Sequence, residues 1–324
     1  MRRIVLCLLA AVVALGTVGY WLHRSRGTTP AVRRLVSELR SASPLKRAQA
    51  AYKLGSMGSA ANASIPELVA LLDDGSAVWL HEVDPDPRRN TDERLSPAIV
   101  SSRALAQIGA SSLPYLSDVI REGSPSSRKH AVDAVALIGG DEAMSILRSA
   151  LASKDTVVKT AAAGAMYQMD DPRLRMLQKA LRDPDPQVKR AAIESIQYIC
   201  GDSNECEAMH NVSGCLKASD EKVRETAVRA IGFVFSSKAS GQVEVDLLSM
   251  LHDRSPSVRS EAAFSLGLIR SWNAVRPLVR RLTDSNASVR GKARWALVNI
   301  TGKDFGSGQY KWARWIAKSE RTKP

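Results

Sequence analysis

The sequence predicts an all-α fold: an α-solenoid of about eight helical hairpins closed by a C-terminal capping helix. Three observations predict it. An apolar residue recurs about every 30 residues, a small residue stands four positions before it, and aromatic residues make up only 5% of the chain. Small side chains let helices approach closely, and a period of this length is typical of arrays in which each hairpin is buried by its neighbours.

The recurring apolar position defines the first helix of each hairpin, and we name it the repeat slot. It is filled in order by Leu54, Leu105, Val135, Met166, Ile196, Ile231, Leu266 and Leu297. The small residue four positions earlier is Ala50, Ser101, Ala131, Ala162, Ala192, Ala227, Ala262 or Ala293. Residues four apart lie on one face of a helix, so this pair predicts the face that packs against the next repeat.

The stretch from Ser255 to Asp284 shows one complete unit. Its first helix carries an apolar face of Val258, Ala262, Ser265, Leu266 and Ile269. Its second helix, with Asn273 as the expected N-cap, carries Val275, Leu278, Val279 and Leu282. Two short amphipathic helices cannot bury both faces against each other, which is why the unit needs copies on either side.

The first 26 residues are expected to form a membrane anchor or a signal segment. An uncharged run spans residues 4–22 and approaches the ~20 residues that cross a bilayer as a helix. We therefore expect a single-pass membrane protein whose solenoid lies on the extracytoplasmic side. A signal peptide cleaved near Ala14 and Gly16 is the alternative.

The remaining boundaries follow from the repeat. Residues 27–39 are expected to be a linker and the start of the first helix, residues 40–302 the repeat array, and residues 303–324 a cap with a basic tail. A terminal repeat exposes an apolar face that must be covered. The covering side chains are expected to be Tyr310, Trp312, Trp315 and Ile316; a tryptophan-based peptide pocket is the other interpretation.

A motif at the start of several units carries a resemblance to a known family. The pattern D-x-x-V-[KR]-x-x-A-x-x-[AS]-[LIM] spans Asp155–Met166, Asp185–Ile196 and Asp220–Ile231. It resembles the HEAT repeat, in the short bacterial type named after phycocyanobilin lyases, and the resemblance covers residues 40–302. The resemblance implies a protein-binding solenoid; the lyase name travels with the repeat and does not imply lyase chemistry.

One repeat position is basic in nearly every unit, and we name this series the basic ladder. Its members are Arg47, Arg128, Lys159, Lys189, Arg224, Arg259 and Arg290. In HEAT families such residues pair with acids in the turns and join one repeat to the next, which implies Asp155, Asp185 and Asp220 as partners. A ladder that faces a ligand is the alternative.

The widest gap between slots, from Leu54 to Leu105, contains an insertion at residues 75–97. Long loops in compact arrays are often functional. Its candidate partner-binding residues are Trp79, His81 and Glu82, and together with Asp84 and Asp86 they could line a pocket or ligate a cation. A plain surface flap is the alternative.

Three cysteines and one histidine cluster between residues 200 and 215. A disulfide between Cys200 and Cys206 would suit an oxidising compartment, and free thiols are the alternative. Zinc binding by Cys200, Cys206, His210 and Cys215 needs a break in the helix, because Cys206 and Cys215 would lie on opposite faces. We expect no metal and no other cofactor.

The net charge of +13 is concentrated at the two ends of the chain, in residues 24–54 and 270–324. Nucleic-acid binders usually show a continuous basic stripe with stacking aromatics, so a nucleic acid is not an expected partner. The N-terminal basic patch would suit anionic lipid heads. No phosphate loop, nucleophile elbow or paired-carboxylate motif appears, and no residue is proposed as catalytic.

These observations predict a non-catalytic, membrane-tethered scaffold that binds a protein or peptide, with the middle repeats and the insertion as contact regions. An enzyme-accessory subunit or a degenerate metal-dependent enzyme that uses the loop around His81 is the alternative from another class. A third interpretation is a membrane-associated structural protein without a discrete ligand.

Overall fold

The structure, a computed structural model, describes residues 29–84, 93–168, 173–201, 207–236 and 241–321. The chain divides into two compact units, Met1–Ala152 and Ser153–Pro324. The boundary falls within the range that the sequence assigns to one repeat array. The described part of each unit consists of helices, apart from one short pair of strands in the first unit.

The first unit begins with α2 (Pro30–Glu38), which packs on α3. Its hairpins are α3 (Pro44–Ser56) with α4 (Ile65–Ala70), α6 (Pro97–Ile108) with α7 (Leu113–Glu122), and α8 (Pro125–Ile138) with α9 (Gly140–Leu151). The first helices pack in sequence order, α3 on α6 and α6 on α8. The insertion contributes β1 (Val78–Trp79), α5 (Leu80–Val83) and β2 (Arg94–Leu95).

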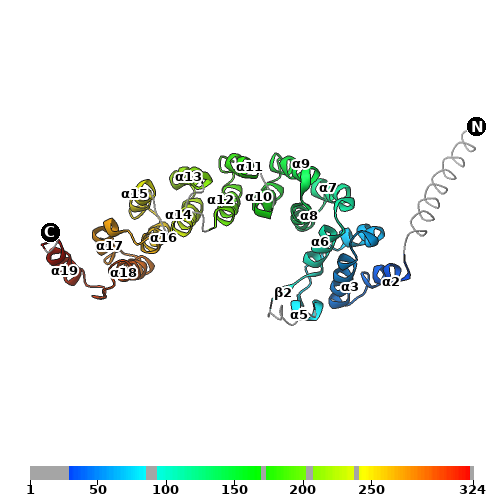
Figure 1. Cartoon of the computed structure of the whole chain (residues 1–324), viewed down its shortest axis with the longest axis horizontal. Coiled ribbons are helices and arrows are strands. Elements are labelled where there is room, and N and C mark those ends of the chain that lie inside the picture. The colour runs from blue at the N-terminus through cyan, green and yellow to red at the C-terminus, as the bar shows by residue number, and fades with distance from the viewer. Residues whose placement is uncertain (1–28, 85–92, 169–172, 202–206, 237–240, 322–324) are drawn as a thin grey trace, which may run out of the picture. The chain divides into compact units, whose positions relative to one another are not determined.

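The second unit repeats the same hairpin. Its first helices are α10 (Thr156–Ala165), α12 (Pro186–Cys200), α14 (Glu221–Val234), α16 (Pro256–Leu268) and α18 (Ala287–Thr301). Its second helices are α11 (Arg173–Ala180), α13 (Glu207–Ser213), α15 (Gly241–Met250) and α17 (Val275–Arg281), followed by α19 (Gln309–Arg321). Figure 1 shows the first helices, α10 to α18, as one row and the second helices, α11 to α17, as a second row above it.

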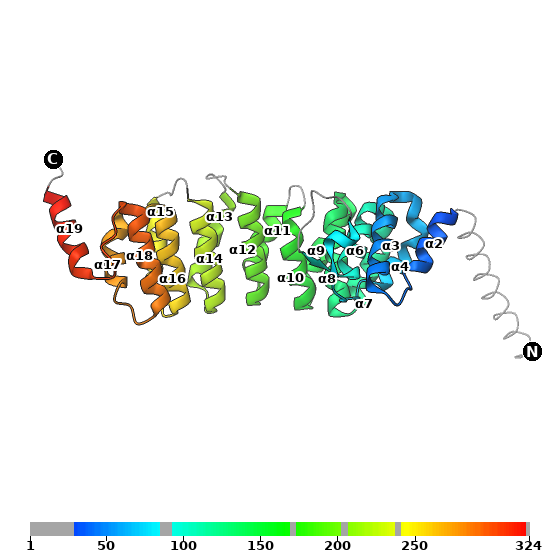
Figure 2. The same ribbon diagram turned by 90° about the horizontal axis from the view of Figure 1, so that it is seen from below.

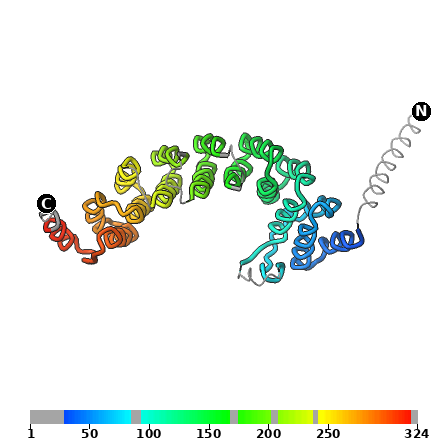
Figure 3. The backbone as a smooth tube through the Cα atoms, viewed as in Figure 1, coloured from blue at the N-terminus to red at the C-terminus, as the bar shows by residue number. Residues whose placement is uncertain are grey.

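Neighbouring first helices of the second unit lie side by side with similar axis directions, as Figures 1 and 2 both show. Each packs on the next: α10 on α12, α12 on α14, α14 on α16 and α16 on α18. The tube in Figure 3 traces this alternation between the two rows along the chain. The first-helix row therefore presents one continuous face on the side away from the second helices.

The repeat slots form the core of both units. Every slot residue from Leu54 to Leu297 has no solvent-exposed surface, and neither does any of the small residues four positions earlier. Glycine extends the pattern: a Cβ on Gly267, directly after the slot of α16, would lie 2.9 Å from the Ala296 Cα of α18. The all-α solenoid predicted from the sequence is confirmed.

Polar caps explain where the first helices begin. A side-chain oxygen of the residue before the helix accepts a hydrogen bond from a backbone N–H of the first turn, which is otherwise left without a partner. The capping residues are Ser43, Ser96, Ser124, Asp155, Asp185, Asp220 and Asn286. Proline follows four of these caps, and its fixed φ angle suits the first helical position.

The C-terminal helix α19 packs on α17. Trp312 is fully buried, its indole N–H donates to the Gly306 carbonyl oxygen at 2.9 Å, and Ile316 is buried one turn later. Tyr310 does not belong to this covering face, contrary to the sequence-based expectation, because it is 78% exposed. It lies two residues before Trp312, which on a helix is nearly the opposite face.

Within the described ranges, no helix combines the length and the apolar character needed to cross a bilayer. The uncharged run at residues 4–22 lies outside those ranges, as do Ala14 and Gly16. The membrane anchor and its alternative, a cleaved signal peptide, therefore stay predictions.

Candidate functional site

The insertion in the first unit is held against α3 by two hydrogen bonds. Its strands pair antiparallel, with Trp79 opposite Arg94. The Gln49 side-chain amide on α3 donates to the Glu82 carbonyl oxygen at 2.8 Å, and the Tyr52 hydroxyl donates to Asp84 Oδ1 at 3.1 Å. The described part of the insertion therefore packs on α3, the first helix of its own hairpin.

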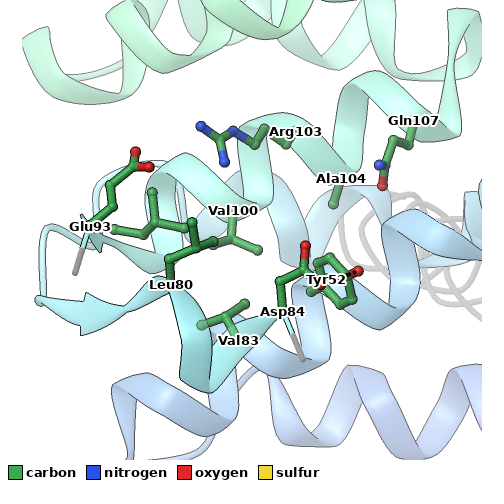
Figure 4. Close-up of a pocket in the computed structure, with 10 residues that line it drawn as sticks. Tyr52, Leu80, Val83, Asp84, Glu93, Val100, Arg103, Ala104 and Gln107 are labelled. Atoms are coloured by element: carbon green, nitrogen blue, oxygen red, sulfur yellow. Dashed lines mark hydrogen bonds between the residues drawn. The ribbon is translucent and has the colours of Figure 1, made fainter. Parts of the chain in front are cut away.

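A cavity of about 380 Å³ lies between the insertion and helices α3 and α6. Figure 4 shows Tyr52 and Asp84 on one side of it, with Arg103 and Gln107 of α6 on the other. Leu80, Val83, Leu95 and Val100 supply its apolar walls. Its polar groups therefore come from the insertion and from both helices beneath it.

The residues of the insertion that the sequence singled out occupy different places. The Trp79 ring is stacked on His81, with ring centroids 6.2 Å apart, and the Arg94 guanidinium lies 4.7 Å from the Trp79 ring centroid. Glu82 accepts a hydrogen bond from the Trp79 backbone N–H at 3.4 Å. Trp79, His81 and Glu82 do not line the cavity, whereas Asp84 does. Asp86 lies outside the described residues, and partner binding by Trp79, His81 and Glu82 stays a prediction.

Within the described residues, four ladder pairs are seen in which the cation binds a carboxylate in the turn that follows the second helix of its own hairpin. Arg224 donates from Nε and Nη2 to Asp253 at 2.7 and 2.9 Å, and Arg259 does the same to Asp284 at 2.9 and 2.8 Å. The other two pairs are Arg47 with Asp74 and Lys159 with Asp183. In the second unit each pair joins a first helix to the turn that leads into the next first helix.

The acid of each pair also orders its own turn. The carboxylate accepts the backbone N–H two residues later: Asp183 from Asp185, Asp253 from Ser255, and Asp284 from Asn286, at 2.8 to 3.0 Å. In the second unit this places the ladder acid two residues before the helix cap. The guanidinium of the preceding repeat and the N–H of the turn therefore share one carboxylate.

This geometry corrects one partner implied by the family resemblance. Lys159 binds Asp183 and not Asp185, because the Asp185 carboxylate accepts the Gln187 backbone N–H at 2.8 Å and caps α12. Asp155 and Asp220 likewise cap α10 and α14. The motif begins at the cap, whereas the ladder acid stands two residues before it.

The pairs depress the pKa of their acids. The Arg259 hydrogen bonds, aided by the turn N–H, lower the pKa of Asp284 to about 2. For Asp253, burial raises the pKa, but the hydrogen bonds from Arg224 and Ser255 outweigh it, and the net pKa is lowered. The pKa values of Asp74 and Asp183 are lowered in the same way, against burial, by their ladder partners and turn N–H groups.

Further contacts of the ladder involve Arg128, Lys189 and Arg290. Arg128 donates from Nε to the Gly123 carbonyl oxygen at 2.6 Å, and Arg290 donates from Nη1 to two carbonyl oxygens of its own turn, at residues 284 and 285. Lys189 lies on the wall of a cleft at the turn before α14. Lys189 is therefore the ladder residue best placed to contact a ligand, because it lines a cleft.

Aromatic side chains mark the open face of the first-helix row in the second unit. They are Tyr167 after α10, Tyr198 on α12, Phe233 on α14, Phe264 on α16 and Trp295 on α18. The sequence reasoning did not identify them. A signal was present: in a chain with 5% aromatic residues, four of the five stand two positions before or after a repeat slot.

The rings lie close enough to form contacts between repeats. The Tyr167 and Tyr198 ring centroids are 4.4 Å apart, and those of Phe264 and Trp295 are 4.7 Å apart. Between these two contacts, Tyr198 and Phe233 line a cleft of about 600 Å³ on α12 and α14. Tyr198 is 70% exposed and Phe233 is 50% exposed. This cleft is the most exposed aromatic part of the face.

The cysteine cluster is described only in part. Cys200 is disulfide-bonded, Cys215 is a buried free thiol, and Cys206 lies outside the described residues. The pairing of Cys200 with Cys206 therefore stays a prediction. The His210 ring lies 6.1 Å from that of Phe235, and the described part of the chain holds no group of three or more His, Cys, Asp or Glu residues placed to bind a metal.

Comparison with known proteins identifies the repeat. The family model for HEAT repeats matches residues 98–167, 113–197, 174–243 and 244–306, whereas no curated protein matches the chain. Among solved structures, an engineered protein is 20% identical over 90% of this chain and 92% of its own, with a TM-score of 0.41. The Escherichia coli protein YibA is 19% identical over 79% and 92%, with a TM-score of 0.49.

A third solved structure has the highest TM-score of these three. A chain of the Kap95p–RanGDP structure has a TM-score of 0.55 and 11% identity, over 89% of this chain and 44% of that one. At such identity the likeness shows the fold alone. The family matches extend from residue 98 to residue 306, which is most of the sequence, and they coincide with the stacked hairpins. The chain therefore belongs to the HEAT-repeat family.

Proposed function

We propose that the chain is a non-catalytic interaction scaffold that binds an extended, proline-rich segment of a partner protein across the first-helix row of its second unit. The observation that carries this proposal is the cleft between α12 and α14, where two large rings, Tyr198 and Phe233, are half exposed or more. Contiguous exposed aromatic surface is rare on a monomer and is enriched where proteins bind each other.

The spacing of the helices favours an extended partner. Packed helices lie about 8–10 Å apart, so aromatic side chains on successive first helices recur at about that interval. A polyproline II segment rises ~3.1 Å per residue with three residues per turn, which is about 9 Å per turn. Every third residue of such a segment would therefore meet the aromatic group of the next repeat.

Polar groups beside the rings suit a partner whose backbone has no internal hydrogen bonds. Gln197, Glu194 and Arg229 line the same cleft as Tyr198 and Phe233. The Arg229 guanidinium and the Glu194 carboxylate are 3.6 Å apart and both about half exposed, so each keeps capacity for a further hydrogen bond. Because the pair has no net charge, it favours a segment of low net charge, as polyproline II recognition by aromatic grooves does.

Membrane tethering through residues 4–22 is the second part of the proposal. The run is uncharged and close to the length of a transmembrane helix, and basic residues follow it. A tether would confine the scaffold to a membrane surface, on the extracytoplasmic side in the orientation favoured by a short N-terminal tail. Binding and tethering are separable and need separate tests.

The binding test uses the full-length chain in detergent and a fluorescent synthetic peptide with proline at every third position. Fluorescence anisotropy measures the Kd for the wild type, for the double variant Tyr198→Ala/Phe233→Ala, and for Val245→Ala. Val245 is the matched control, because it is an apolar side chain, 58% exposed, on α15 in the other row. We expect the double variant to weaken binding at least about tenfold and Val245→Ala to leave the Kd unchanged.

A glycine-substituted peptide of the same length should bind weakly to every variant. Equal Kd values for the wild type and the double variant, or no binding of the proline peptide to the wild type, would refute the proposed binding face. Tethering is tested by membrane fractionation of the full-length chain against a chain that lacks residues 1–28. Full-length protein in the soluble fraction would refute the anchor without touching the binding proposal.

A further inference from the structure

The turn before α14 lacks the carboxylate that the basic ladder binds in three other turns of the second unit. In the turns before α12, α16 and α18, the residue two positions before the cap is an aspartate: Asp183, Asp253 or Asp284. Before α14, whose cap is Asp220, that position is Ala218. The ladder residue of the preceding repeat is Lys189 of α12, and it lines one cleft with Ala218, whose methyl group takes the place of a carboxylate.

Asp183, whose pKa responds to the Lys189 charge, does not replace the missing carboxylate. Burial raises the pKa of Asp183, but hydrogen bonds from Lys159 and from the Asp185 N–H outweigh it, and the Lys189 charge lowers the pKa further. Both oxygens of Asp183 are, however, already bound by the Lys159 ammonium at 2.8 and 2.9 Å, and one also accepts the Asp185 N–H. The carboxylate is therefore shared between two lysines, and it cannot neutralise both.

A cleft of about 570 Å³ stands at this turn. Three of its lining side chains are cationic, Arg182, Lys189 and Lys217, and none of its lining residues is acidic. Gln178, Asn211 and Ser219 add neutral hydrogen-bonding groups. Like charges that share a cleft repel each other, and a bound anion relieves this repulsion and gains charge-assisted hydrogen bonds.

The backbone at the lip of the cleft favours an anion as well. The carbonyl oxygens of Ala218 and Ser219 would repel an anion if they pointed freely into the cleft. Both instead accept hydrogen bonds from Arg224 Nη1, at 2.8 and 2.9 Å, and Ser219 accepts a further one from Arg254. Their negative ends are thus neutralised from behind by two further guanidinium groups.

We propose that this cleft binds a phosphate group, held by Lys189 at its base and by Arg182 and Lys217 at its rim. A phosphate monoester carries close to two negative charges at neutral pH, which suits three cations better than a carboxylate does. The cleft is several times larger than a single phosphate, and its rim is open, since Arg182 and Lys217 are exposed. The group can therefore be free phosphate or a phosphorylated side chain of a partner.

The sharpest test restores the missing acid. Ala218→Asp places a carboxylate opposite Lys189, as in the neighbouring turns, and should fill the cleft with an internal ion pair. Isothermal titration calorimetry of the full-length chain measures binding of inorganic phosphate, of a short phosphoserine peptide and of the same peptide without phosphate. We expect the wild type to bind both phosphate probes, and Ala218→Asp and Lys189→Gln to lose at least about 90% of that affinity.

Lys222→Gln is the matched control, because Lys222 is an exposed lysine of α14 that pairs with Glu225 and does not line the cleft. It should bind phosphate as the wild type does. Tighter binding of the phosphopeptide than of inorganic phosphate would identify a phosphorylated partner as the source, and the reverse order would identify free phosphate. Failure of the wild type to bind either probe, or unchanged binding by a folded Ala218→Asp protein, would overturn the proposal.

Discussion

Arg259 of α16 binds Asp284 through two parallel hydrogen bonds, from Nε to Oδ2 at 2.9 Å and from Nη2 to Oδ1 at 2.8 Å. The same guanidinium donates from Nη1 to the carbonyl oxygens of residues 253 and 254 in the preceding turn. One side chain therefore connects the turn before its own helix to the turn before the next helix. Side-chain exposures of 12% and 4% show that the pair is largely removed from solvent.

Removal of one partner of this pair should be costly. Asp284→Asn leaves Arg259 with an uncompensated charge and weakens the hydrogen bond to the turn N–H. We expect the free energy of unfolding to fall by about 2–3 kcal/mol, measured by urea denaturation. The exposed pair of Arg294 and Asp304 is the control, with side chains 50% and 45% exposed. Asp304→Asn should leave stability unchanged, and equal losses in the two variants would contradict this account.

The lowered pKa values of the ladder acids predict acid sensitivity. The pKa of Asp284 is about 2 in the folded chain, against an ordinary value of 3.8. Because the folded pKa is the lower one, its stabilisation is complete above about pH 4 and is lost as the pH falls towards 2. We expect a loss of about 1–2 kcal/mol from this carboxyl, allowing for solvent screening. Thermal denaturation between pH 6 and pH 2 should show the loss, and Asp284→Asn should reduce its size.

Close packing between first helices predicts opposite effects for two glycine substitutions. A Cβ on Gly267 would lie 2.9 Å from the Ala296 Cα, and backbone cannot yield cheaply. Gly267→Ala should therefore destabilise the protein by about 1–3 kcal/mol. A Cβ added to Gly291 of α18 would have nothing within 4 Å. Because alanine has the higher helix propensity, Gly291→Ala should stabilise the protein by about 0.5–1 kcal/mol. Urea denaturation of both variants measures the contrast, and a shared sign would be inconsistent with it.

The end of the array depends on Trp312. It is fully buried against Phe305, with ring centroids 4.9 Å apart, and its indole N–H donates to the Gly306 carbonyl oxygen. Trp312→Ala should cost about 3–5 kcal/mol and should expose the amides of α17 and α18 to hydrogen exchange. Tyr310→Ala, two residues away and exposed, should change stability by less than about 0.5 kcal/mol. Normal amide protection in Trp312→Ala would show that α19 does not cap the array.

The cysteine pairing has a direct chemical test. We expect peptide mapping without reduction to find Cys200 linked to Cys206, and alkylation of the unfolded chain to label Cys215. Burial raises the pKa of the Cys215 thiol, although the Lys189 charge opposes this, so labelling of the folded chain should be slow. A Cys200 thiol that is alkylated without reduction would disprove the pairing.

The sequence was sufficient for the repeat because packing between first helices requires small residues at fixed intervals. Leu54 and Leu297, at opposite ends of the series, are both fully buried, as the slot predicts. The acidic partners of the basic ladder were harder to predict from the sequence. In the second unit the acid lies two residues before the caps of α12, α16 and α18, whereas this position is Ser153 before α10 and Ala218 before α14. No motif over a single helix includes it.

The candidate sites depended on contacts that sequence spacing does not reveal. The cavity beneath the insertion joins Asp84 to Tyr52 of α3 and to Arg103 and Gln107 of α6, which are far apart in the sequence. The five aromatic side chains on the first helices of the second unit escaped the sequence analysis for another reason. Its rings stand sometimes before and sometimes after the slot, because two positions one turn apart share the same open side of a first helix.

The missing acid in the turn before α14 affects how firmly α12 is joined to α14. In the second unit, side-chain clamps of low exposure hold the joints α10–α12, α14–α16 and α16–α18, whereas the ion pair recorded between α12 and α14 is the solvent-exposed one of Arg229 with Glu194. Among the described residues, that joint therefore lacks the buried ion pair that bridges the other three. Tyr198 and Phe233 stand on either side of it, so flexing there would widen or narrow the gap between the two rings. An anion bound at Lys189 would supply the missing bridge between α12 and α14 and would thereby restrict the distance between the two rings.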